Sequence, residues 1–80
     1  MEIYFTGQYI RNIKKLPRDA QKSVHSAVKI LHNWPQVSNI KAMVNQPGYR
    51  LRVGRYRVMF EIEGEKIVVT DVKIRNERTY

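Results

Sequence analysis

The spacing of apolar residues changes near residue 40, and this change constrains the fold more than any other feature of the chain. Between residues 7 and 34, apolar side chains recur every three or four positions, which is the period of an amphipathic helix. Between residues 49 and 74, apolar and polar residues alternate, which is the period of a half-buried strand. Helices followed by strands on short turns predict an α+β fold.

Two short helices are predicted in the first half, after a short first strand at residues 1–5. Thr6 and Gly7 offer a capping position for the first helix, and Pro17 suits the first turn of the second, which Pro35 closes. The expected apolar side of the first helix comprises Tyr9, Ile10, Ile13 and Leu16. That of the second comprises Val24, Ala27, Val28, Leu31 and Trp34. We interpret Tyr4, Tyr9 and Trp34 as packing residues.

The second half predicts three strands, at residues 49–53, 56–62 and 66–74, with a possible short strand at 40–44. Gly54 and Arg55 form a two-residue connection with glycine first, which predicts a type II′ hairpin turn. The last strand is apolar enough on both faces to be central. Strict alternation places Val68, Thr70, Val72 and Ile74 on one of its faces, and Ile67, Val69, Asp71 and Lys73 on the other. The expected order is β-α-α-β-β-β, in a mainly antiparallel sheet with both helices on one face.

The length of 80 residues allows one small domain, residues 1–80. The absence of cysteine excludes disulfides and thiolate metal sites and fits a reducing compartment. No apolar run approaches the roughly 18 residues of a membrane span, and the N-terminus lacks the order of a signal peptide. We therefore expect a cytoplasmic protein with no membrane partner.

Charge is the most informative part of the composition: 15 Lys+Arg stand against 7 Asp+Glu, a net charge of +8. Such a balance attracts polyanions, so it favours nucleic acid or an acidic protein as the partner. His25 and His32 would lie about 10 Å apart along a helix, which is too far for one metal ion. We expect both histidines on the surface, and no metal site.

Residues 49–57, YRLRVGRYR, hold four arginines and no acid. We expect Leu51, Val58 and Val72 to face the helices, and alternation then places a basic set on the open face of the sheet. That set is Arg50, Arg52, Arg57, Lys73 and Arg75. Two interpretations stay open. The set is a cradle for phosphates, or it keeps a solvated face soluble, with Arg57 paired to Asp71.

The second half of the chain resembles the RelE/ParE superfamily of bacterial toxins from toxin–antitoxin pairs. The similar segments are Tyr49 to Gly54, Tyr56 to Phe60, Glu63-Gly64-Glu65, Ile67 to Val69, and Arg75 to Tyr80. The helix pair, with KKLP at residues 14–17 leading into its second member, is also similar to the family. The resemblance implies a RelE-like fold.

In the RelE branch, the resemblance implies cleavage of messenger RNA in the ribosomal A site, without a metal or cofactor, by attack of a 2′-hydroxyl on the adjacent phosphate. By position, Arg57 and Arg75 would stabilise the scissile phosphate and Tyr80 would assist proton transfer. Ile74 stands where many relatives carry a histidine, which puts histidine-based acid–base chemistry in doubt. The expected contacts to RNA phosphates are Arg50, Arg52, Arg55 and Lys73.

The resemblance also implies partners and alternatives. An acidic antitoxin would cover the basic face, and operator DNA would be bound only through that antitoxin. The ParE branch has the same fold but inhibits DNA gyrase without cutting RNA. A third possibility is a weakly active remnant that is held by its antitoxin.

Overall fold

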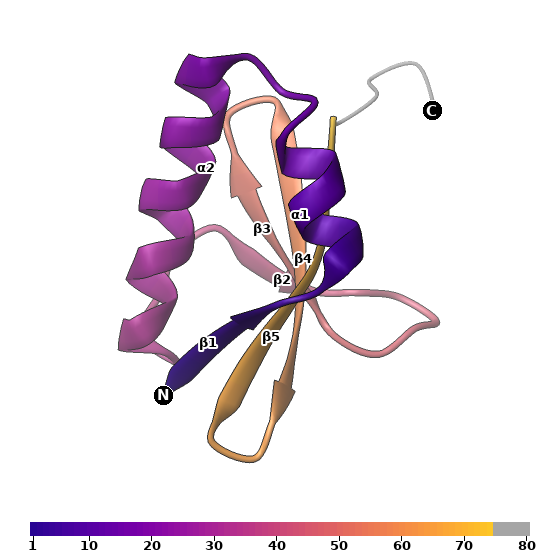
Figure 1. Cartoon of the computed structure of the whole chain (residues 1–80). Helices are drawn as coiled ribbons and strands as arrows, with labels where there is room; N and C mark the ends of the chain where they lie inside the picture. Colours follow the sequence, from indigo (N-terminus) through magenta and orange to yellow (C-terminus); the bar gives the residue numbers. More distant parts are fainter. Residues whose placement is uncertain (75–80) are drawn as a thin grey trace.

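The computed structural model describes residues 1–74 and has the α+β architecture that the sequence predicts (Figure 1). The elements in chain order are β1 (Glu2–Phe5), α1 (Gly7–Ile13), α2 (Arg18–Ile30), a 3₁₀ turn η1 (Leu31–Asn33), β2 (Ile40–Ala42), β3 (Tyr49–Val53), β4 (Tyr56–Glu63) and β5 (Lys66–Ile74). No helix within residues 1–74 is both long and apolar enough to cross a membrane.

The five strands form one sheet in the order β1-β5-β4-β3-β2. Neighbours from β2 to β5 are antiparallel, whereas β1 runs parallel to β5. The parallel pair has a simple cause, because the two helices between β1 and β2 provide the long connection that parallel strands need. β5 is flanked by β1 and β4, which confirms the central position predicted from its apolar composition.

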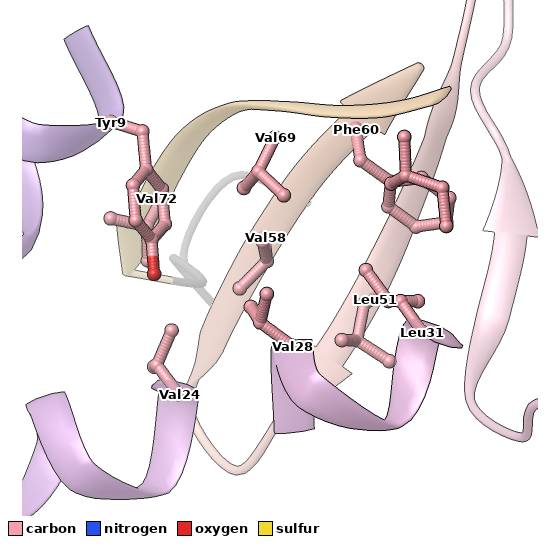
Figure 2. Close-up of a cluster of buried hydrophobic side chains, with 10 residues drawn as sticks. Tyr9, Val24, Val28, Leu31, Leu51, Val58, Phe60, Val69 and Val72 are labelled. Atoms are coloured by element: carbon pink, nitrogen blue, oxygen red, sulfur yellow. The ribbon is translucent and has the colours of Figure 1, made fainter. Parts of the chain in front are cut away.

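The core lies between the sheet and the helices, as Figure 2 shows. Val24 and Val28 of α2 pack against residues of β3, β4 and β5, and Tyr9 of α1 contributes from the other helix. Trp34 meets the rings of Tyr49 and Phe60 at centroid distances of 4.9 and 5.7 Å, which confirms that it packs in the core. The fully buried side chains are Phe60, Leu31, Ile67, Val24, Val28, Val58 and Val69.

Three details of the N-terminal half differ from expectation. Ile10 was predicted on the apolar side of α1 but is 43% exposed, because Tyr9 occupies the core-facing position beside it. Tyr4 was predicted to be a packing residue but is 44% exposed, and its hydroxyl donates a hydrogen bond to the carboxylate of Glu2. Pro17 is the N-cap of α2, one position before the first turn in which it was placed.

The strict alternation predicted for β5 is wrong because the strand contains a β-bulge. Phe60 pairs with Val69, but the preceding residue Met59 pairs with Asp71, so Thr70 is an extra residue without a partner position. A bulge shifts the side-chain pattern by one. Ile67 and Val69 therefore point into the core before the bulge, and Val72 does so after it.

Thr6 joins the bulge to the start of α1. Its backbone N–H donates to the carbonyl of Val69 at 3.0 Å, and its hydroxyl donates to the carbonyl of Thr70 at 2.7 Å. The same hydroxyl accepts from the N–H of Tyr9 at 3.2 Å, as an N-cap does. The cap predicted at Thr6 is confirmed, and it places α1 beside the C-terminal half of β5.

Candidate nucleic-acid interface

The alternation of β4 decides which side chains reach the open face of the sheet. Val58 and Phe60 are completely buried between the sheet and the helices. Arg57 and Met59 must therefore point to the opposite face. Arg57 is only half-buried, and its apolar stem lies on the same face as Met59, which is 9% exposed.

Three cationic residues form one row across the middle of this face. The register pairs Arg52 of β3 with Arg57 of β4, and Arg57 in turn with Lys73 of β5. Adjacent strands lie about 4.8 Å apart, so each cation is a direct neighbour of the next. We call Arg52, Arg57 and Lys73 the cation row. Arg52 and Lys73 are exposed.

Further cations surround the cation row. Arg50 lies two residues before Arg52 on the same face of β3, and the register places it between Lys41 of β2 and Met59 of β4. Arg55 is exposed in the turn between β3 and β4, where Gly54 has a φ of 56°, in agreement with the predicted turn with glycine first. The structure thus brings Arg50, Arg52, Arg57 and Lys73 onto one face, as the sequence predicts.

The suggested pair between Arg57 and Asp71 does not form within residues 1–74. The register places Lys73, not Asp71, opposite Arg57. Asp71 is 5% exposed, and its carboxylate accepts from Gln8 Nε2 at 2.8 Å and from Asn12 Nδ2 at 2.6 Å. Asp71, the acid nearest to the cation row on this face, therefore binds side chains of α1 and does not pair with Arg57.

The predicted residues Arg75 and Tyr80 lie outside the described residues, so their roles stay predictions. Sequence reasoning did not find Gln8 and Asn12. Their spacing of four residues places both on the same side of α1, with Lys15 next to them. The helical spacing of Gln8, Asn12 and Lys15, next to the apolar side of α1, was the sequence signal that these polar side chains share one surface.

Acidic residues gather at the other end of the sheet. The β3–β4 turn and the β4–β5 turn lie at opposite ends (Figure 1), and the second turn carries Glu63 and Glu65. A hollow of about 550 Å³ at that end is lined by Met1, Glu2, Glu65 and Lys66. It is remote from the cation row and carries carboxylates, so the positively charged surface is the open face near the β3–β4 end.

Comparison with known proteins agrees with this architecture. A family model described as the ParE toxin of the type II toxin–antitoxin system, parDE, matches residues 3–79. Toxin RelE3 from Methanocaldococcus jannaschii is 23% identical over 73 residues, which cover 85% of this chain and 83% of that protein.

Two solved structures show the same fold. A RelB–RelE antitoxin–toxin complex from Methanococcus jannaschii contains a chain that is 24% identical, with a TM-score of 0.75 over 90% of this chain and 89% of that one. The toxin–antitoxin complex RelBE2 from Mycobacterium tuberculosis contains one that is 25% identical, with a TM-score of 0.79 over 92% and 96%.

Proposed function

This chain belongs to the ParE toxin family of type II toxin–antitoxin systems, within the RelE/ParE superfamily, and from that premise we propose that it is a ribosome-dependent endoribonuclease that cleaves messenger RNA. The observation that carries the proposal is the cation row, Arg52, Arg57 and Lys73, on the open face of the sheet.

The cation row is costly for the isolated fold. Like charges directly opposite on neighbouring strands are destabilising. Two such pairs meet at Arg57, while the nearby carboxylate of Asp71 is held by Gln8 and Asn12. A bound phosphate would offset that repulsion, and the planar guanidinium group of arginine matches phosphate oxygens in pairs.

The same row suits the chemistry of strand cleavage. In that reaction the ribose O2′ forms a bond to the adjacent phosphorus while the bond to O5′ breaks, which leaves a 2′,3′-cyclic phosphate and a 5′-hydroxyl. Negative charge builds up on the phosphate oxygens during the attack, and fixed cations stabilise that charge more than they stabilise the ground state. Arg57, in the middle of the row, is the proposed centre of this stabilisation.

A proton must also leave O2′ and another must reach O5′. Arginine remains protonated at neutral pH and is a poor general base. We assign the proton transfer to Tyr80 and additional phosphate stabilisation to Arg75, both by resemblance to the family. The arginines provide the positive charge, so the proposed reaction needs no metal ion.

The proposed protein partner is an acidic antitoxin. The RelE chains from Methanococcus jannaschii and Mycobacterium tuberculosis were solved in complexes with their antitoxins. For this chain we propose that acidic side chains of an antitoxin cover the cation row and thereby block RNA. Operator DNA would be bound through the antitoxin.

The test is primer extension on a defined messenger RNA in a purified translation system, with and without ribosomes. The wild type should cut only when ribosomes are present. Arg57→Gln, which keeps most of the stem and removes the charge, should reduce cutting at least about 100-fold, because losing one transition-state contact of this kind costs that much. Lys22→Gln, an exposed change on α2, should cut like the wild type. Equal cutting by Arg57→Gln would refute the role of the cation row.

Inhibition of DNA gyrase is the second candidate, because the matching family model is that of ParE. In that case the wild type would leave ribosome-bound RNA intact and would block the supercoiling of plasmid DNA by gyrase. A folded protein with neither activity would be an antitoxin-bound remnant.

A further inference from the structure

The buried carboxylate of Asp71 fixes two amide side chains at the edge of the open face. Gln8 Nε2 donates to Oδ2, and Asn12 Nδ2 donates to Oδ1, at 2.8 and 2.6 Å. Oδ1 also accepts from the backbone N–H of Val72 at 2.8 Å. These contacts determine the orientation of both amides, because only their nitrogens can donate to a carboxylate.

An amide whose nitrogen is fixed in this way presents its oxygen on the opposite side. No residue within 1–74 donates to Gln8 Oε1 or to Asn12 Oδ1. Gln8 is an exposed residue, and no buried side-chain oxygen or nitrogen of the less exposed residues within 1–74 lacks a partner, so the unpartnered Asn12 Oδ1 reaches the solvent. Because both nitrogens are held by the carboxylate of Asp71, both amides lie at the same edge of the open face, beside β5.

This pair of acceptors lies next to the cation row. Asp71 and Lys73 are two residues apart on the same face of β5, and Lys73 is opposite Arg57. Two residues of a strand span about 7 Å. A base extends sideways from its sugar and phosphate, so a strand whose phosphates lie on the cation row can bring a base to Gln8 and Asn12.

We propose that Gln8 and Asn12 form a base-recognition site that accepts hydrogen bonds from a guanine of the bound RNA. This inference rests on the proposed function, since it requires an RNA strand on the open face. Guanine is the base with two neighbouring donors, N1–H and the 2-amino group, on its Watson–Crick edge. Adenine and cytosine place an acceptor beside their donor, and an acceptor opposite a fixed amide oxygen is repelled.

Asp71 acts in this site as a positioning residue. It keeps the amides from rotating, which would otherwise exchange an acceptor for a donor and remove the selectivity. The bulge at Thr70 contributes to the same arrangement, because it turns Asp71 toward α1 and away from the core.

The test compares cleavage maps of the wild type and Gln8→Ala in the purified translation system, on messages that differ only by guanine or adenine at each position. The ratio of cutting at guanine to cutting at adenine should fall at least about fivefold in the variant, since a good pair of base contacts provides at least about 1 kcal/mol of discrimination. Inosine, which lacks the 2-amino group, should replace guanine poorly for the wild type. Asn33→Ala, which removes an exposed amide outside α1, should leave the ratio unchanged.

Gln8 is exposed, so its replacement leaves the core intact, and thermal melting verifies the fold. Asn12→Ala is the second variant, and it should change the same ratio. If the wild type cuts RNA and both folded variants keep its guanine preference, or if the wild type has none, the amides only support α1 and the inference is overturned while the proposed function stands. If the wild type does not cut RNA, the proposed function fails and this inference fails with it.

Discussion

Neutralising Arg57 should make the isolated protein more stable while it removes activity. Arg57 is the central member of the cation row and has a cation opposite it on each neighbouring strand, Arg52 on β3 and Lys73 on β5. Each directly opposed pair of like charges costs about 0.2–1 kcal/mol. Arg57→Gln removes both pairs, so the free energy of unfolding should rise by about 0.4–2 kcal/mol.

Salt provides the diagnostic for this prediction. The screening length is about 30 Å at 0.01 M salt and about 3 Å at 1 M. The gain should therefore be largest at 0.01 M and close to zero at 1 M. For a domain of this size, about 1 kcal/mol corresponds to a rise of about 4–8 °C in the melting temperature.

The assay is urea and thermal unfolding of the antitoxin-free protein at both salt concentrations. Lys22→Gln is the matched control, because it removes one positive charge from the exposed side of α2 without removing a cross-strand pair. Its effect should stay within about 0.5 kcal/mol. A variant at Arg57 that is no more stable than the wild type at 0.01 M, or a gain that persists at 1 M, would refute the reasoning.

Three further predictions concern the fold. Thr6→Ala should cost about 1–2 kcal/mol in urea unfolding, because it removes the cap of α1 and a bond to β5, while Thr6→Ser should restore most of the loss. Gly48→Ala should lower the free energy of unfolding more than Gly64→Ala does. Both glycines have a positive φ, but a Cβ at Gly48 would lie 2.8 Å from the carbonyl oxygen of Phe60, whereas a Cβ at Gly64 would meet nothing within 4 Å. Burial raises the pKa of Tyr9, so its contribution to stability is present below the unfolded pKa of about 10 and is lost as pH rises through the folded pKa. The free energy of unfolding of Tyr9→Phe should therefore fall less between pH 9 and pH 11 than that of the wild type.

Much of the candidate site could be predicted from sequence because alternation in a strand is a local property. Once Leu51 and Val58 are assigned to the core, Arg52 and Arg57 must point the other way. The short β3–β4 connection then fixes the register that places these two arginines opposite one another.

The features that could not be predicted depend on contacts between distant parts of the chain. Asp71 meets Gln8 and Asn12 across 63 and 59 residues, and nothing local distinguishes this from a pair with Arg57. The bulge at Thr70 likewise depends on pairing with β4 and on Thr6. The prediction for Lys73 was correct because it was made relative to Val72. Both residues follow the bulge, so the alternation between them still holds.

The bulge gives β5 one position at which its length can change. Ile67 and Val69 follow one parity and Val72 the other, and the single extra residue at Thr70 reconciles them. Deletion of Thr70 would make the alternation regular, with Val69 still opposite Phe60, Asp71 still opposite Met59 and Val72 still toward the core. The deletion would instead remove the carbonyl that accepts from the Thr6 hydroxyl, and so weaken the attachment of α1 to β5. In alignments of related toxins, a one-residue gap in β5 is therefore expected at Thr70 before any other position of the strand.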